Sequence, residues 1–225
     1  MHKNRLFVIL AFMFLNCTAE AQTVKFGVKA GINFASVSAY DNPTNSTYQN
    51  KSYGNFRFGG IAEINWHKLA IQTELILDGK GGIDTYINPE NSTNRRKNTR
   101  LCYLETPIVF LYKIPTKTGT LLFGGGPYAA YGISGKYSLS GIVFDSAIDG
   151  SNQVVFGNNE NSDYKRTDYG LNLRAEIRLL HGIGFGINYE YGLRNIATPS
   201  VYDDIDIKTR NKVLGIAVSY LFNNH

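Results

Sequence analysis

The chain of 225 residues has little cysteine, little histidine and no long apolar run. Its two cysteines are Cys17 and Cys102, and Cys17 lies in a segment that we expect to be removed, so the mature chain has no second thiol for an intramolecular disulfide. The one extended apolar run, residues 6–15, is shorter than the ~20 residues that a membrane-spanning helix needs. We therefore expect neither a disulfide-stapled fold nor a helical membrane anchor.

The charge of the chain is also modest. The formal net charge is +5, and it falls to +4 if Lys3, Arg5 and Glu20 are removed with the N-terminus. No basic stretch is interleaved with aromatic residues in the manner of a nucleic-acid-binding surface. We expect no nucleic-acid partner.

The N-terminus has the three parts of a secretory signal. Lys3 and Arg5 supply the positive charge, residues 6–15 the apolar region, and Ala19-Glu20-Ala21 the small-residue cleavage site. Asn16 is a poor match to the small residue that precedes a lipidated cysteine, so we do not expect Cys17 to carry a lipid. The predicted organisation is a signal peptide at residues 1–21 and one domain at residues 22–225.

Apolar and polar residues alternate along residues 168–195. Leu171 and Leu173 fall on one face, and Asn172 and Arg174 fall on the other. Period two indicates β-strands, and the strands exceed the ~5–6 residues that are usual in soluble sheets. Membrane-spanning strands need ~9–11 residues, with an apolar face toward lipid and a polar face toward the lumen.

The same alternation predicts strands throughout the domain. They lie at residues 25–34, 56–66, 69–78, 99–113 and 120–138, in the pair within 168–195, and at 210–222. Long polar segments at 38–55, 79–98, 139–166 and 196–208 alternate with short turns at 67–68, 114–119 and 181–182. The fold class is therefore all-β: an eight-stranded antiparallel transmembrane up-and-down β-barrel. Long external loops and short periplasmic turns then place both termini in the periplasm.

Two places interrupt the expected ladders. Pro107 has no N–H to donate, so we expect a bulge or a broken pairing there. Gly124-Gly125-Gly126 disturbs the alternation of the fifth strand.

Charged residues gather on the inner faces of the predicted strands. Because buried charges must be paired, and because eight strands enclose a space that side chains can fill, we predict a salt-bridged lumen instead of an open pore. The predicted lumen charge network consists of Arg57, Glu63, Glu74, Glu105, Arg174, Glu176, Arg178, Glu190 and Arg194.

No constellation predicts catalysis, a cofactor or a metal. Barrel enzymes such as lipid A acylases and outer-membrane phospholipases use Ser and His together, but His67 and His181 lie in the predicted periplasmic turns. His2 belongs to the signal peptide and His225 to the C-terminal tail. We therefore predict that the protein is not an enzyme.

Several motifs resemble those of the outer-membrane β-barrel (porin-like, PorT-like) proteins of Bacteroidetes. They are FGVKAGINF at 26–34, CYLETPIVFLYK at 102–113, GPYAAYGISGK at 126–136, DYGLNLRAEI at 168–177 and YGLRNI at 191–196. Two positions depart from the family pattern: Thr106 replaces an aliphatic residue, and Asn223-Asn224-His225 follows Phe222, the aromatic residue that commonly ends the chain. The resemblance implies an integral outer-membrane protein that contacts outer-membrane lipid and the outer-membrane insertion machinery.

Three functions remain open at this stage. The first is a structural or surface-interaction protein that acts through long extracellular loops. The second is a component of an outer-membrane secretion or transport assembly, as the PorT-like resemblance suggests, with a protein partner at the external loops or periplasmic turns. The third is a small-solute porin.

Overall fold

The computed structural model of the chain describes residues 23–40, 47–88, 92–159, 161–198 and 208–222. Among the residues that the structure describes, no helix has the length and apolar character needed to cross a membrane. The described residues form ten strands in one sheet, and every paired strand is antiparallel to its neighbour. The strands are β1 (Thr23–Tyr40), β2 (Thr47–Lys51), β3 (Tyr53–Trp66), β4 (Leu69–Asn88), β5 (Thr93–Pro115), β6 (Gly119–Val143), β7 (Ser146–Gln153), β8 (Thr167–Leu179), β9 (Ile183–Gly192) and β10 (Lys208–Leu221).

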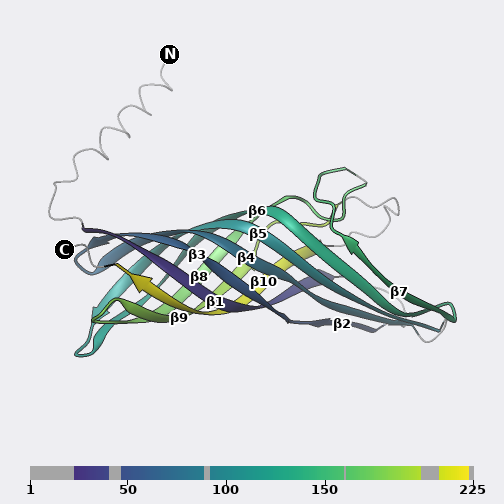
Figure 1. Cartoon of the computed structure of the whole chain (residues 1–225), viewed down its shortest axis with the longest axis horizontal. Coiled ribbons are helices and arrows are strands. Elements are labelled where there is room, and N and C mark those ends of the chain that lie inside the picture. Colours follow the sequence, from purple (N-terminus) through teal and green to yellow (C-terminus); the bar gives the residue numbers. More distant parts are fainter. Residues whose placement is uncertain (1–22, 41–46, 89–91, 160, 199–207, 223–225) are drawn as a thin grey trace, which may run out of the picture.

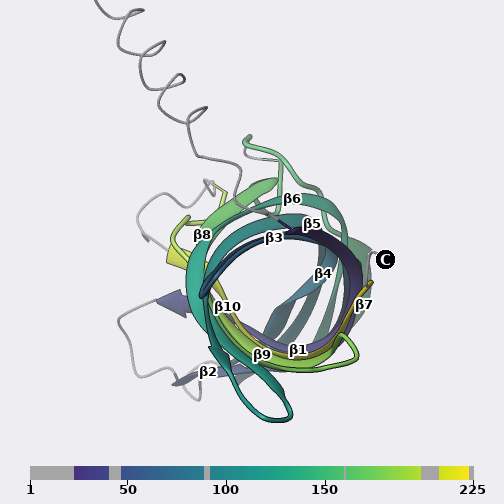
Figure 2. The same cartoon turned by 90° about the vertical axis from the view of Figure 1, so that its left-hand side faces the viewer.

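Eight of these strands close into a barrel in the order β1, β3, β4, β5, β6, β8, β9 and β10. The ring is completed where β1 pairs with β10, from Gly27 opposite Leu221 to Tyr40 opposite Lys208. Figure 2 shows this ring end-on. The two remaining strands lie off the ring, since β2 pairs with β4 and β7 pairs with β6. The predicted eight-stranded antiparallel barrel is confirmed.

The distribution of side chains is the reverse of that in a soluble protein. On β3, Phe56 is 82% exposed while its neighbour Arg57 is 1% exposed. This contrast recurs on the other strands, because successive side chains point to opposite faces and the outer face is apolar. We call the outward apolar side chains the lipid-facing belt; it includes Phe26, Val28, Ile32, Phe34, Phe56, Phe58, Leu69, Leu75, Leu77, Leu104, Ile108, Phe110, Leu121, Phe123, Tyr131, Tyr169, Leu171, Leu173, Phe185, Ile187, Ile216 and Val218.

Short turns connect the strands at one end of the barrel, which Figure 1 shows on the left together with the start of β1 and the end of β10. His67 has a positive φ of 31° in the turn between β3 and β4, and Gly182 has a φ of 85° in the turn between β8 and β9. His67 and His181 lie in these two turns, as predicted, and both side chains are exposed.

At the other end, three of the predicted loops were wrong in large part. The segment 79–98 is mostly strand, because β4 continues to Asn88 and β5 begins at Thr93. Likewise, segment 38–55 holds the end of β1, β2 and the start of β3, and segment 139–166 holds the end of β6 and β7. Beyond the lipid the outer face no longer has to be apolar, so the period-two hydrophobic signal disappears while the hydrogen-bonded ladder continues. Of the fourth predicted loop, 196–208, residues 199–207 lie outside the described residues.

We call residues 47–51, 79–88, 92–100 and 134–153 the outer extension. In Figure 1 it forms the long sheet on the right, where β2 and β7 lie beside the prolonged β4, β5 and β6. Its farthest turn carries positive φ angles at Phe144 and Asp145, and Phe144 is 70% exposed.

The expected break at Pro107 is confirmed. Pairing between β4 and β5 is continuous up to Thr73 opposite Ile108 and resumes only at Ile76 opposite Glu105. A separate bulge between β5 and β6 lies at Cys102 and Tyr103. The predicted disturbance at Gly124–Gly126 is present in the side-chain pattern, where three half-buried glycines replace the alternation, although β6 itself is continuous through them. The paired strand β5 lies close to β6 there, and a Cβ on Gly124 would meet the Phe110 carbonyl oxygen at 1.8 Å.

Candidate functional site: the lumen and its outer mouth

Buried charged side chains fill the barrel interior from the short-turn end upward. Nearest to the short turns, Arg178 donates two hydrogen bonds to Glu63, of 2.7 and 2.9 Å, and lies 2.8 Å from a carboxylate oxygen of Glu176. Ser219 also donates to Glu176, at 3.3 Å. Two parallel N–H donors match the two carboxylate oxygens of Glu63, which fixes the geometry of the pair as well as its charge.

The next layer is centred on Glu74. Lys29 and Arg174 both form ion pairs with Glu74, and Arg174 also donates to the side-chain carbonyl of Gln72. The side chains of Lys29, Arg174 and Glu74 are at most 4% exposed. These two layers therefore contain three carboxylates and three cations, and each carboxylate forms an ion pair with at least one of the cations.

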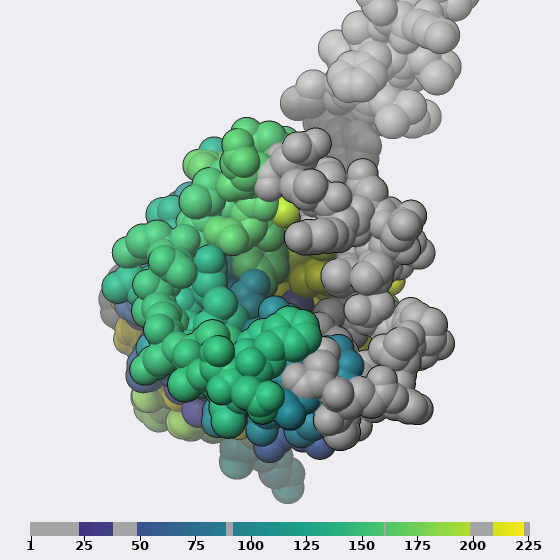
Figure 3. Space-filling model, turned by 90° about the vertical axis from the view of Figure 1, so that its right-hand side faces the viewer, coloured from purple at the N-terminus to yellow at the C-terminus, as the bar shows by residue number. Residues whose placement is uncertain are grey.

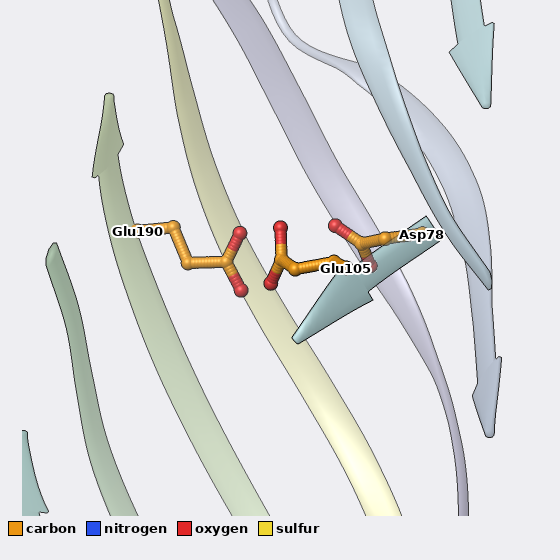
Figure 4. A group of neighbouring side chains, drawn as sticks. All are labelled: Asp78, Glu105 and Glu190. Carbon is orange, nitrogen blue, oxygen red and sulfur yellow. The ribbon is translucent and has the colours of Figure 1, made fainter. Parts of the chain in front are cut away.

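The third layer lies closer to the outer extension and contains more acid than base. Arg57 lies 3.5 Å from Asp78 and 3.2 Å from Glu190. Lys80 lies 2.6 Å from Glu105 and 3.2 Å from Glu190. Figure 4 shows the carboxyl groups of Asp78, Glu105 and Glu190 pointing toward one another across the lumen.

The ligand atoms of these three carboxylates lie within 4.8 Å of one another, a spacing that could hold a metal ion. Arg57 and Lys80, however, already form ion pairs with all three, so the positive charge at this point comes from the protein itself. A divalent cation would have to enter beside two fixed cations. The geometry therefore fits a node of the ion-pair network better than a metal centre.

A fourth carboxylate, Asp168, completes this layer. Its Oδ2 atom accepts hydrogen bonds from the Tyr128 hydroxyl at 3.2 Å and from Asn211 at 2.9 Å, and it lies 3.7 Å from Lys80. The Lys80 ammonium also lies 4.1 Å from the centroid of the Tyr128 ring. Four carboxylates thus surround two cations, and Lys80 and Arg57 each form ion pairs with more than one carboxylate.

An apolar plug lies above the charges. It contains side chains of β5 and β6 and of the segments that link β7 to β8 and β9 to β10, and its buried members are Leu101, Tyr103, Tyr128, Ala130, Val154, Phe156, Tyr164 and Ile196. Backbone hydrogen bonds hold it in place, from Gly157 to Tyr164 at 3.0 Å and from Lys165 to Ile196 at 2.8 Å. Charge pairs therefore occupy the lower part of the lumen, and packed aromatic and aliphatic side chains lie above them.

A small cavity of about 150 Å³ opens at the outer mouth, lined by Val37, Asp84, Tyr86, Arg95, Lys97, Tyr164 and Thr209. Figure 3 looks onto this end of the molecule, where the surface is hollowed. Burial raises the pKa of Asp84 to about 6, although Lys97 and Arg95 act in the opposite direction. Lys97 lies over the rings of Tyr137 and Tyr164, with centroid distances of 4.8 and 5.4 Å.

Eight residues of the predicted lumen charge network point into the lumen and meet there. They are Arg57, Glu63, Glu74, Glu105, Arg174, Glu176, Arg178 and Glu190. The placement of Arg194 inside the lumen was wrong. Arg194 follows the end of β9, and its guanidinium lies 5.7 Å from the ring centroid of Tyr169, whose side chain is 50% exposed in the lipid-facing belt.

Sequence reasoning missed Lys80 and Asp168 as members of the network. Lys80 was assigned to a loop, although it continues the inward series of Gln72, Glu74 and Asp78 at spacing two. Asp168 likewise continues the inward series of β8 by one step beyond Gly170. Extending each alternation to the last residue before a break in pattern would have found both.

A closed antiparallel ring with an apolar exterior and a charged interior defines an integral β-barrel of the bacterial outer membrane. Residues 20–198 match the family model described as outer membrane protein beta-barrel domain, and the chain belongs to that family. A search of curated proteins finds no match.

Solved barrels of the outer membrane resemble the chain. Neisserial surface protein A is 12% identical, with 89% of this chain and 99% of that chain covered and a TM-score of 0.43. OprG from Pseudomonas aeruginosa is 13% identical, with 90% of this chain and 98% of that chain covered and a TM-score of 0.42.

Proposed function

We propose that this outer-membrane protein is a closed barrel that acts as a structural or surface-interaction protein through its outer extension. The observation that carries the proposal is the lumen itself. A solute would have to displace paired charges that are nearly all inaccessible to solvent, and then the plug around Phe156 and Tyr164. Open porins use ~16–18 strands, whereas eight strands leave a space that side chains fill.

The outer extension supplies the surface for interaction. In it β4, β5 and β6 continue well beyond the lipid-facing belt, and β7 adds an edge strand whose side chains are mostly exposed. A hydrogen-bonded sheet holds its side chains in fixed positions, so it is better suited to recognising a partner than a mobile loop of the same composition would be. This role requires no reaction chemistry, and we propose that the protein is not an enzyme.

Conductance tests the closed lumen. Purified protein in planar bilayers is expected to show no stable conductance, both as the wild type and after deletion of the β6–β7 hairpin tip at residues 142–147. Deleting the tip leaves the lumen untouched, so it serves as the matched control for loop effects. A steady conductance from the wild-type monomer would overturn the proposal and favour the small-solute porin.

Orientation needs its own experiment, because the proposed role places the outer extension outside the cell and both termini in the periplasm. In a Cys102→Ser background, Ser146→Cys on β7 and Lys117→Cys in a short turn each supply one exposed thiol in the mature chain. A membrane-impermeant maleimide added to intact cells is expected to label only Ser146→Cys. Labelling of Lys117→Cys alone would show that the barrel is inverted.

The proposal also includes the subgroup of the family, the cleavage of the N-terminus and an alternative role. The motifs at 102–113 and 168–177 support membership of the PorT-like group of Bacteroidetes, and the N-terminal pattern supports cleavage after Ala21 during export. N-terminal sequencing of the mature protein tests the cleavage. Purification in mild detergent tests the alternative role in a secretion or transport assembly, since a stoichiometric periplasmic or inner-membrane partner would favour that role over a lone surface protein.

A further inference from the structure

The outward face of the outer extension carries two cations directly opposite each other. Arg100 on β5 pairs in register with Lys136 on β6, and both side chains are exposed. Like charges at directly opposed positions of an antiparallel pair destabilise the sheet. Neither side chain has a hydrogen-bond or ion-pair partner among the residues that the structure describes.

The neighbours of this pair offer donors and open space but no acid. On the β6 side, Ser138 is the exposed diagonal neighbour of Arg100, and Gln153 of β7 lies opposite Lys136. On the other side Arg100 lies opposite Gly81, which has no side chain. The Tyr53 ring lies over the Arg100 guanidinium, 4.6 Å from its carbon atom, and thereby orients it.

The pair also lies at a particular height on the barrel. Leu104 and Tyr131, paired in register, belong to the lipid-facing belt, and Arg100 lies four residues before Leu104 on β5, toward the outer extension. Four residues of a strand span ~13 Å, which is ~10 Å along the membrane normal for a strand tilted by ~40°. The headgroup region begins at the edge of the hydrocarbon and is ~5–8 Å thick on each side, within reach of a long cationic side chain.

Other cations mark the same boundary around the barrel. Three tyrosines at this end of the belt each lie beneath a basic side chain, with distances of 5.6 to 5.8 Å from the charged group to the ring centroid. These couples are Tyr131 with Arg166, Tyr169 with Arg194, and Tyr191 with Lys212. Tyrosines with cations above them are typical of a membrane–water interface, where the charge remains in the headgroup layer.

From this geometry we propose that Arg100 and Lys136 form a binding site for the phosphate group of a lipid headgroup in the leaflet at this end of the barrel. The phosphate places its charge between the two cations and relieves their repulsion, and Ser138 and Gln153 can donate further hydrogen bonds. The acyl chains of the same lipid then lie on the belt below, beside Leu104 and Ile133. The site does not depend on the proposed closed lumen.

Native mass spectrometry of the full-length mature protein in a non-ionic detergent tests the site. The probe is diphosphoryl lipid A, titrated against the wild type, Arg100→Gln, Lys136→Gln and the double variant. A cation near an anionic lipid surface strengthens binding about fivefold, so each single variant is expected to weaken it about fivefold and the double variant more than tenfold. Lys68→Gln/Lys117→Gln, which removes two exposed cations at the short-turn end, is the matched control and is expected to bind as the wild type does.

Two further arms distinguish the source of the phosphate. Dephosphorylated lipid A is expected to bind the wild type and the double variant equally. Inorganic phosphate at the concentration of the lipid is expected not to displace it, because it lacks the acyl chains. The proposal would be overturned if diphosphoryl lipid A bound the wild type and the double variant equally, if the wild type bound dephosphorylated lipid A as tightly as diphosphoryl lipid A, or if inorganic phosphate displaced the lipid.

Discussion

Replacing Lys80 by methionine removes the cation on which the acid-rich layer of the lumen depends. Its side chain is 0% exposed and lies 2.6 Å from Glu105, 3.2 Å from Glu190 and 3.7 Å from Asp168. Among the described residues, Lys80 is the only ion-pair partner of Glu105. Methionine keeps most of the volume, so the loss of charge dominates. Removing one partner of a buried pair leaves an uncompensated charge, and we expect the free energy of unfolding to fall by about 3–5 kcal/mol.

A matched variant, Lys29→Met, shows whether the loss of stability is specific to Lys80 or follows the removal of any cation from the lumen. Lys29 is also buried, but it pairs with a single carboxylate, Glu74, and Glu74 keeps Arg174 as a second partner. Lys29→Met is therefore expected to lose clearly less stability than Lys80→Met. The double variant Lys80→Met/Glu105→Gln removes the orphaned charge and is expected to recover at least 1 kcal/mol relative to the sum of the two single changes, in line with the ~0.5–3 kcal/mol coupling of residues in contact.

Urea unfolding of the protein in lipid vesicles measures these differences. Trp66 is the only tryptophan of the chain and lies at the short-turn end of β3, so its fluorescence reports the loss of the folded barrel at a distance from the mutated layer. The reasoning is refuted if Lys80→Met is no more destabilising than Lys29→Met. Strict additivity of Lys80→Met and Glu105→Gln would refute it equally.

Four further outcomes are expected. Leu173→Arg, on the lipid-facing side of β8, should lower stability by ~2–4 kcal/mol in the same urea assay, whereas Leu180→Arg in the short turn should lower it by at most ~1 kcal/mol; equal losses would contradict the assignment of the belt. Glu63→Gln should destabilise more than Glu176→Gln, because both carboxylate oxygens of Glu63 accept hydrogen bonds from Arg178, whereas Glu176 accepts them through Oε1 alone; the reverse order would show that this bidentate pair is not the stronger contact. Since the folded pKa of Asp84 is raised to about 6 from 3.8, the folded state binds the extra proton between these values, so stability should fall as pH rises through about 6; this trend should vanish in Asp84→Asn, and its persistence there would assign it to another group. Phe156→Ala should loosen the plug against Tyr103, to which Phe156 packs edge-on at 5.8 Å, and speed amide exchange at residues 154–164 while leaving β8 protected; unchanged exchange would show that the plug does not hold this segment.

Much of the barrel could be predicted from the sequence because lipid imposes a simple rule on each strand. Every second residue from Leu69 to Leu77 had to be acceptable to hydrocarbon or to the interface, and every residue between them had to fit a polar interior. That rule is local, so it can be seen along a single strand without knowledge of its partners. It predicted the faces of β3, β8 and β9, the even number of strands and eight members of the lumen charge network.

The same rule failed where the lipid ends. Beyond Asp78 the strand β4 continues for ten residues with no apolar face, and hydrogen bonding to β5 maintains it although its composition is that of a loop. The ladders in these segments consist of backbone hydrogen bonds within hairpins, which residues of almost any composition can form, so the composition of 79–98 and 139–166 could not indicate them. Lys80 was missed for this reason.

The amino-acid sequence by itself determined that the chain is an outer-membrane barrel, which side of most membrane strands meets lipid, and that charged side chains of both signs line the interior. Only the tertiary structure decided which carboxylate meets which cation, that four acids gather around Arg57 and Lys80, and that Arg100 lies opposite Lys136. The physical reason is the sequence separation of the residues that each effect involves. The lipid acts on every residue separately and is recorded as alternation, whereas an ion pair across the lumen depends on strand register and barrel closure, which join residues more than a hundred positions apart such as Arg57 and Glu190.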